Sequence, residues 1–289
     1  SAERALVFPS GWQANAALLS SLPRAGDIVL SDQLNHASLI DGMRASRAER
    51  IRVRHLDLKA YTRELDRPRG DGEVFVVVES LYSMEGDLAP LGELAALCRR
   101  FDAHLLVDEA HAVGIYGTKG SGWIEACGVE REVTASVVTF GKALAVSGAA
   151  VVGSKRLVEL LVQRARPFVF TTAVSPLVLI AAEAALDVVL REPQRRARLH
   201  ANARRLRERL TEVDPLVMPD GGPIVSLLLG ENEKAMAAAR KLQLAGFDVR
   251  GIRPPTVPEG TARLRISVHA DHSDSQIDGL AAAVAKALA

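Results

Sequence analysis

The stretch Ser136-Val137-Val138-Thr139-Phe140-Gly141-Lys142 decides how the chain is read, because a short apolar run in it leads to a glycine and a lysine. Such a run next to glycine is typical of a buried strand. Open α/β sheets bind ligands at the carboxyl ends of their strands, which is where Lys142 is expected. In a partly dry site a lysine loses part of the advantage of its charged form, and its neutral amine can react with a carbonyl group. Most lysines after a strand are solvated, so this stretch alone establishes no site.

Two further stretches supply partners for such a lysine. Residues 104–111, His-Leu-Leu-Val-Asp-Glu-Ala-His, form another buried-strand pattern that ends in Asp108 and is followed by His111. Residues 7–15, Val-Phe-Pro-Ser-Gly-Trp-Gln-Ala-Asn, predict a turn that opens a helix, and a helix N-terminus is a ready anion site. A phosphate cradle, a carboxylate and an amine are what pyridoxal phosphate (PLP) requires of a protein.

The composition excludes several classes of protein. The 289 residues suffice for a large domain and a smaller one, and the formal net charge of +1 does not favour nucleic acid or a membrane surface as a partner. Cys98 and Cys127 have neither metal-ligand spacing nor a disulfide pattern, so we expect no metal and a reducing, cytoplasmic setting. The longest weakly polar stretch, 143–153, is too short to span a bilayer, and residues 1–21 do not resemble a signal peptide.

Alternating strand and helix patterns predict a mostly parallel sheet. Strands are expected at 27–30, 74–80, 105–108 and 137–140, with one helix at 13–22 before the first strand and another at 91–101 between the second and the third. Residues 146–153 are expected to pair beside the last strand. A charged helical segment follows from 175 to 213. Residues 222–289 alternate strands and helices as in a small α+β domain. The predicted domains are therefore a large cofactor-binding domain at 1–174, linking helices at 175–213 and a small domain at 214–289.

Six motifs in order along the chain identify a family resemblance. They lie at residues 8–15, 35–39, 82–87, 107–111, 139–142 and 253–258. With them, the sequence resembles the α-oxoamine synthases, a family of PLP enzymes, over essentially its whole length. The resemblance implies an α/β fold of the fold-type I, aspartate aminotransferase-like class, with a mostly parallel large domain and a small α+β C-terminal domain.

The resemblance also implies an activity, which is the decarboxylative condensation of L-alanine with an acyl-CoA. In the member of the family that this sequence resembles most, the acyl donor is a pimeloyl thioester and the product leads to biotin. Family members are homodimers whose active sites are shared between two chains. They also carry a segment before the turn at Pro9 that contributes to the acyl pocket and the dimer interface, and this sequence does not include it.

Site residues follow from the resemblance one by one. Lys142 would bind the cofactor aldehyde and accept the substrate α-proton, and Asp108 would keep the ring nitrogen protonated. His36 would lie on the ring face beside the substrate, and His111 would hydrogen-bond the phenolic oxygen. Further cofactor contacts are implied for Gly11, Trp12, Ser83 and Thr139, and for Thr171 and Thr172, one of which reaches the phosphate of the partner subunit. Arg253 would hold the substrate carboxylate, and Thr256 would contact the substrate.

The residues alone leave ordinary roles open for several of these side chains. His36 suits a helix start, Asp108 suits a cap, and Trp12 stands where the family usually has phenylalanine or tyrosine. Arg253 sits on a proline-stiffened loop suited to gripping a carboxylate, but it could equally be a surface arginine. Arg263 and Arg265 rank lower for that role because they alternate within a strand.

Parts of the sequence also fit other functions. Sister enzymes of the family use glycine or serine, namely 2-amino-3-oxobutyrate CoA ligase, 5-aminolevulinate synthase and serine palmitoyltransferase; the motif Arg-Pro-Pro-Thr-Val-Pro at 253–258 favours the alanine enzyme. A non-catalytic PLP-binding subunit or a fragment is a further alternative. Asp-Glu-Ala-His also occurs in helicases, but the phosphate loop that a helicase needs is missing upstream of it.

Overall fold

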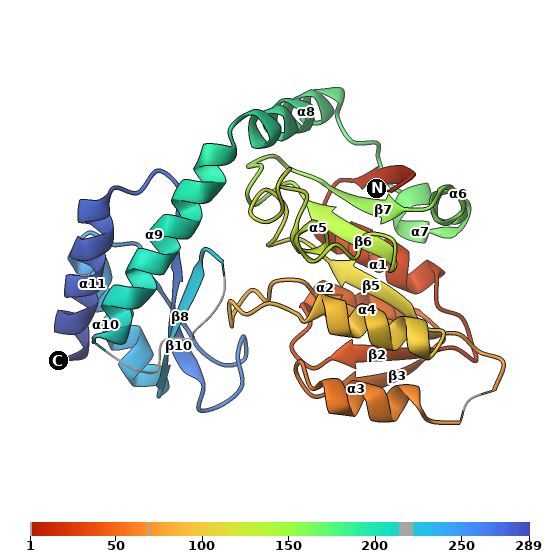
Figure 1. Ribbon diagram of the computed structural model, residues 1–289, viewed down its shortest axis with the longest axis horizontal. Coiled ribbons are helices and arrows are strands. Elements are labelled where there is room, and N and C mark those ends of the chain that lie inside the picture. The colour runs from red at the N-terminus through yellow and green to blue at the C-terminus, as the bar shows by residue number, and fades with distance from the viewer. Residues whose placement is uncertain (1, 69, 214–221) are drawn as a thin grey trace. The chain divides into compact units, whose positions relative to one another are not determined.

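The computed structural model describes residues 2–68, 70–213 and 222–289. The chain divides into two compact units, one formed by Ser1–Leu81 with Ala89–Arg191 and the other by Tyr82–Leu88 with Glu192–Ala289 (Figure 1). The loop 82–88 therefore belongs with the C-terminal unit, although it leaves and re-enters the N-terminal one. The division into 1–174, 175–213 and 214–289 stays a prediction, and its boundary at 214 lies outside the described residues.

A seven-stranded sheet in the order β1-β7-β6-β5-β4-β2-β3 forms the centre of the first unit. Its strands β3, β2, β4, β5 and β6 run parallel, while β7 pairs antiparallel with both β6 and β1. The predicted mostly parallel sheet is thus confirmed. The strands are β1 (Arg4–Phe8), β2 (Ile28–Asp32), β3 (Glu49–Val53), β4 (Val74–Glu79), β5 (His104–Asp108), β6 (Val133–Thr139) and β7 (Ala149–Gly153).

Eight helices of the first unit appear among the described residues. They are α1 (Gly11–Ser21), α2 (Ala37–Ala45), α3 (Leu58–Leu65), α4 (Leu91–Arg100), α5 (Trp123–Cys127), α6 (Lys155–Arg164), α7 (Arg166–Val169) and α8 (Pro176–Arg191). No helix in the described parts of the chain has the length and apolarity needed to cross a membrane.

The two faces of the sheet have separate cores, as the alternation of side chains along a strand requires. Val77, Leu106 and Val137 pack in the cluster that contains α1 and α2 side chains. Val138, one residue further along β6, packs instead in the cluster with Ala182 of α8. Strand β4 is buried at every position because both of its faces are covered, as is usual for a parallel strand.

Helix α1 is fixed at its start and along its side. Ser10 caps it by accepting a hydrogen bond from the backbone N–H of Gln13. Along its side α1 lies close to α2, because a Cβ on Gly42 would come within 2.8 Å of the backbone oxygen of Asn15. Only glycine permits this approach without a shift. The close contact sets where Asn15 lies at the carboxyl edge of the sheet.

The second unit has a three-stranded antiparallel sheet in the order β8-β10-β9, as predicted for an α+β domain. Its strands are β8 (Ile224–Gly230), β9 (Arg250–Ile252) and β10 (Ala262–Ser267), and its helices are α9 (Pro193–Thr211), α10 (Asn232–Leu244) and α11 (Asp274–Leu288).

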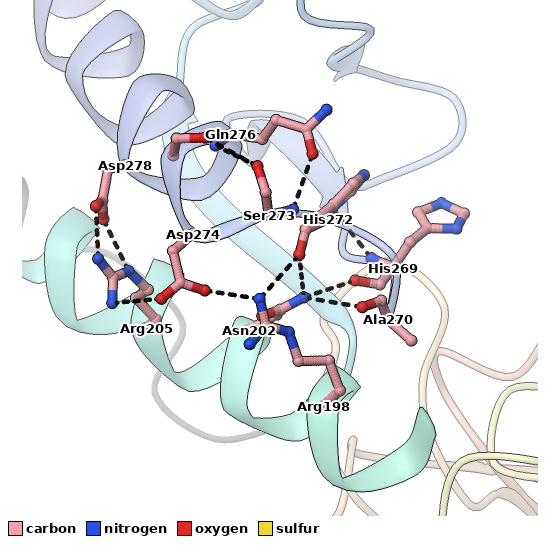
Figure 2. A network of polar contacts seen from close by, with 11 residues as sticks. Arg198, Asn202, Arg205, His269, Ala270, His272, Ser273, Asp274, Gln276 and Asp278 are labelled. Atoms are coloured by element: carbon pink, nitrogen blue, oxygen red, sulfur yellow. Dashed lines mark hydrogen bonds and ion pairs between the residues drawn. The ribbon is translucent and has the colours of Figure 1, made fainter. Parts of the chain in front are cut away.

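Polar contacts join α9 to the start of α11 (Figure 2). The amide nitrogen of the buried Asn202 donates to the carbonyl oxygens of His269 and His272, each at 3.0 Å. Arg205 makes a two-pronged contact with Asp278 and also pairs with Asp274. Arg205 of α9 is thus paired with two acids of α11.

Candidate active site

A cavity of about 380 Å³ lies at the carboxyl edge of the parallel strands in the first unit. Its walls include residues from the start of α1, from the turn before α2, from the ends of β5 and β6 and from the loop after β6. Among the predicted site residues, the lining includes Gly11, Trp12, His36, Asp108, His111, Thr139 and Lys142. The structure thus brings together seven side chains or backbone positions that the sequence distributes over more than a hundred residues.

Sheet register explains why polar side chains gather at this edge. Glu79 and Asp108 end adjacent strands β4 and β5 and lie directly opposite each other. Glu79 is two residues beyond Val77, Asp108 two beyond Leu106, and Thr139 two beyond Val137, so each shares the face that packs against α1 and α2. Three adjacent strands therefore deliver a polar residue to the same side of the sheet, at the same edge.

Asp108 is 5% exposed, and both of its carboxylate oxygens are hydrogen-bonded. The backbone N–H of Ala110 donates to Oδ1 at 2.8 Å, and the side-chain nitrogen of Asn15 donates to Oδ2 at 2.8 Å. A carboxylate fixed by two donors in a buried position has one orientation. The arrangement suits an anion that faces a cationic ring nitrogen.

His36 is exposed toward solvent and held from behind. Its backbone N–H donates to the carboxylate of Glu79, and its Nδ1 lies 2.7 Å from Oγ of Ser38. The backbone N–H of Ser38 also donates to Nδ1 at 3.2 Å, which makes His36 the cap of α2. His36 therefore caps a helix, and the same contacts hold its ring in a fixed orientation beside the cavity.

The start of α1 fits a phosphate group. The first backbone N–H groups of a helix have no partner within the helix and favour an anion. Close approach is built in, since a Cβ on Gly11 would come within 2.6 Å of Cγ2 of Thr139. The hydroxyl of Thr139 donates to the carbonyl oxygen of Ala110 at 3.3 Å, which ties the ends of β5 and β6 together beneath this turn.

Lys142 lines the cavity but is an exposed residue in the single chain. The partly dry surroundings expected from the sequence are not provided by the described residues of this chain alone. His111 is half-buried and Trp12 is 52% exposed, so this side of the cavity is open. The opposite wall, formed by Asp108 and Thr139, is closed.

Glu109 lies beside this wall and is not part of it. Its carboxylate is 1% exposed and accepts hydrogen bonds from the backbone N–H groups of Trp123 and Ile124, at 2.8 and 3.1 Å. Burial raises the pKa of Glu109 to about 7, although these hydrogen bonds oppose the shift. The residue therefore fastens the start of α5 beneath the strand that carries Asp108.

Thr171 and Thr172 lie apart from the cavity that Lys142 lines. They line a second cavity of about 350 Å³, which shares Pro9 and Ser147 with the first. Both threonines are exposed, and the hydroxyl of Thr171 accepts a hydrogen bond from the side chain of Gln13 at 3.3 Å. Neither threonine lines the first cavity. A contribution of these residues to the cofactor site of another chain stays a prediction.

Three predicted site residues belong to the second unit. Ser83 is half-buried in the loop 82–88, and Arg253 and Thr256 are exposed in the loop between β9 and β10. Their roles stay predictions. The lower ranking of two other arginines has a structural reason: Arg263 forms a buried ion pair with Glu85 at 2.9 Å, and Arg265 donates to the backbone oxygen of Ser83 at 2.6 Å.

Sequence reasoning missed Asn15, Ser38 and Glu79, which support Asp108 and His36 from behind. Each was visible only as part of a motif or at the end of an apolar run. Their one available signal is a polar residue placed where a strand or helix is otherwise buried, and that signal does not name a partner.

In the described residues, no group of three or more His, Cys, Asp or Glu is arranged to hold a metal ion.

Comparison with known families and sequences gives consistent matches. The family described as aminotransferase class I and II matches residues 1–284. The 8-amino-7-oxononanoate synthase of Anaeromyxobacter dehalogenans (strain 2CP-C) is 49% identical over 286 residues, which are 99% of this chain and 72% of that protein. The corresponding enzyme of Geobacter sulfurreducens is 45% identical over 287 residues, covering 98% of this chain and 73% of that protein.

Solved structures with the same fold include two enzymes. A variant of serine palmitoyltransferase from S. paucimobilis, bound to a PLP–myriocin adduct, has a TM-score of 0.95 and 33% identity, covering 99% of this chain and 72% of that one. The 8-amino-7-oxononanoate synthase of Francisella tularensis has a TM-score of 0.86 and 31% identity, covering 99% of this chain and 82% of that one. These matches confirm the predicted fold-type I class and PLP as the cofactor.

Proposed function

The chain belongs to the class I and II aminotransferase family and, within it, to the α-oxoamine synthases, and on this premise we propose that it acts as an 8-amino-7-oxononanoate synthase. The reaction joins L-alanine to a pimeloyl thioester of CoA and yields 8-amino-7-oxononanoate, free CoA and CO2, a step of biotin synthesis. The observation that carries the proposal is the cavity that combines Asp108, His36 and Lys142 in a chain 49% identical to a named synthase.

The residues present fit PLP. Its phosphate suits the start of α1, where Gly11 leaves room against Thr139, and its ring nitrogen suits the fixed carboxylate of Asp108. When bound, PLP supplies an aldehyde and a ring that withdraws electrons from the α-carbon of an amino acid. Its aldehyde suits the amine of Lys142, and Trp12, His36 and His111 complete the lining around that space.

The chain's own groups would divide the work among themselves. Asp108 holds a negative charge in place and thereby favours a proton on the facing ring nitrogen. Lys142 would act as the general base that accepts the α-proton of L-alanine. His36 would lie beside the substrate, Arg253 would bind the substrate carboxylate through a two-pronged guanidinium contact, and Thr256 would contact the substrate.

A second copy of the chain is the partner we propose for the apolar surface of the first unit. Phe170, Leu177 and Ile180 are 72%, 77% and 63% exposed, and further apolar side chains of α8 are exposed beside them. Monomeric soluble proteins rarely expose a contiguous apolar face of this kind. Thr171 and Thr172 lie in the same segment, so a homodimer formed here would bring them to a second chain. Sedimentation of the variant Ile180→Asp would be expected to show more monomer.

Serine palmitoyltransferase activity is the second candidate, because those enzymes give the higher TM-score, 0.95 against 0.86. A shared backbone does not select the amino acid, however, and the sequence identity favours the alanine enzyme.

The free cysteines, one buried and one half-buried, are in keeping with the cytoplasmic setting that we propose.

Release of free CoA thiol tests the function. We expect release from pimeloyl-CoA with L-alanine and little with glycine or L-serine. Lys142→Ala should abolish release while PLP still binds without a covalent link; Lys155→Ala, an exposed lysine at the start of α6, is the matched control. Full turnover by Lys142→Ala would disprove the assignment of Lys142. A preference for L-serine with palmitoyl-CoA would support the second candidate instead.

A further inference from the structure

Asn15 connects the two polar groups on the closed side of the cavity. It is 2% exposed on α1, and its side-chain nitrogen donates to Oδ2 of Asp108 at 2.8 Å and to Oγ of Ser38 at 2.9 Å. Ser38 in turn lies 2.7 Å from Nδ1 of His36. A single buried amide therefore links the carboxylate at the end of β5 to the histidine at the start of α2.

The donors and acceptors that each side chain carries determine the direction of each hydrogen bond in this network. An ionised carboxylate only accepts, so the amide must turn its nitrogen toward Asp108. An amide nitrogen has two hydrogens, and here one is used on Asp108 and the other on Ser38. The hydroxyl of Ser38 therefore accepts from Asn15, and its own hydrogen remains for His36.

The hydrogen bonds at His36 indicate the same direction. The backbone N–H of Ser38 donates to Nδ1 of His36 at 3.2 Å, so Nδ1 carries a lone pair and not a proton. The Ser38 hydroxyl then donates to the same nitrogen, at 2.7 Å. A neutral His36 must consequently carry its proton on Nε2, the nitrogen further from α2.

We propose that Asn15 is a positioning residue that fixes the orientation of Asp108 and, by directing the Ser38 hydroxyl toward Nδ1, reinforces the Nε2-protonated tautomer of His36 that the Ser38 backbone N–H also favours. The inference deepens the proposed function, on which its relevance to PLP rests. Oδ1 of Asn15 is buried and makes no hydrogen bond within the described residues, so the two amide hydrogens are the only part of the side chain in use. An unpaired buried oxygen costs stability, so this asparagine is better explained by its two donated hydrogen bonds, which orient Asp108 and Ser38, than by a contribution to stability.

The hydrogen bonds of Asn15 form two branches, one to Asp108 and one through Ser38 to His36, and substitutions can test them separately. Asn15→Leu keeps the approximate size of the side chain and removes both donors, so Asp108 and His36 should both change. Ser38→Ala removes only the branch to His36. Gln13→Leu removes an amide from the same helix without touching either branch, because Gln13 bonds to Thr171 and Ser10. It is therefore the matched control.

The test uses the cofactor-free chain with ¹⁵N-labelled histidine and ¹³C-labelled aspartate, observed by NMR. The native chain should show His36 with its proton on Nε2. Asn15→Leu should alter the His36 ring nitrogens and the Asp108 carboxyl carbon together, Ser38→Ala should alter only His36, and Gln13→Leu should alter neither. In a separate titration with PLP, Asn15→Leu should bind roughly tenfold to a hundredfold more weakly, because a bond to a charged group is lost.

Two results would overturn the proposal. One is an Nδ1-protonated His36 in the native chain, and the other is an Asn15→Leu variant, folded by circular dichroism, whose Asp108 and His36 signals match the native ones. Because the NMR readout needs no substrate and no cofactor, a failure there is distinct from a failure of the synthase assignment, which thiol release decides.

Discussion

Replacing Glu109 by glutamine should remove a pH dependence from the stability of the first unit. Burial raises the pKa of this carboxyl from 4.5 to about 7. Between these two values the folded chain keeps a proton that the unfolded chain loses, so the free energy of unfolding falls as the pH rises. Below about 4.5 and above about 7 the residue contributes no slope. A difference of 2.5 pKa units, from 7 − 4.5, corresponds to roughly 3 kcal/mol.

Glutamine at this position is neutral at every pH and so has no such slope. Glutamine replaces one of the two carboxylate oxygens by an NH2 group, which faces the backbone N–H of either Trp123 or Ile124, so the variant also carries a constant cost of about 1–3 kcal/mol. The slope, and not the absolute stability, is therefore the quantity to compare. Between about pH 4.5 and about pH 7, the native chain should lose roughly 3 kcal/mol relative to Glu109→Gln.

Urea unfolding followed by tryptophan fluorescence suits this measurement. The two tryptophans of the sequence, Trp12 and Trp123, both lie in the first unit, and Trp123 contacts Glu109 directly. Glu130→Gln, at an exposed position in the same unit, is the control and should retain the native slope. Equal slopes for the native chain and Glu109→Gln would refute the reasoning, because a buried acid that stays charged in the folded state contributes no such difference.

Three further predictions test packing and the site. Tyr61→Phe should raise the free energy of unfolding by about 1 kcal/mol in urea, because its fully buried hydroxyl makes no hydrogen bond within the described residues. Arg263→Met should lower it by about 3–5 kcal/mol by removing one member of a buried ion pair; calorimetry of the second unit's transition would measure this. Gly11→Ala should weaken PLP binding at least about tenfold in equilibrium dialysis, because its Cβ would lie 2.6 Å from Cγ2 of Thr139; unchanged affinity would place the phosphate elsewhere.

Much of the fold could be predicted because its elements have strong local signals. The apolar runs of β4, β5 and β6 and the amphipathic pattern of α4 are confirmed within a residue or two at most ends. Strand β3 and helix α3 were not predicted. Strand β3 reads Glu-Arg-Ile-Arg-Val and lies at the edge of the sheet, where a charged strand has one open side and no continuous apolar run.

The site was predictable where a residue follows a recognisable strand or turn, as Asp108, Thr139 and Gly11 do. Asn15 was not, although it lies in a motif quoted from the sequence, because its partner Asp108 is 93 residues away. A hydrogen bond over that separation follows from the packing of α1 on one face of the sheet, and periodicity carries no information on which side chains meet there. Lys142 shows the converse: its place at the cavity was predictable, but the described residues leave it exposed and do not provide the partly dry surroundings expected for it.

The adjacent acids Asp108 and Glu109 show how the sheet assigns different chemistry to one dipeptide. Successive side chains of a strand point to opposite faces, so Asp108 meets Asn15 on the α1 side while Glu109 turns to the start of α5. Asp108 borders the cavity. Glu109 is enclosed, and burial raises its pKa to about 7. Near neutral pH a carboxyl with a pKa of about 7 is only partly ionised, so burial reduces the negative charge that Glu109 places beside Asp108.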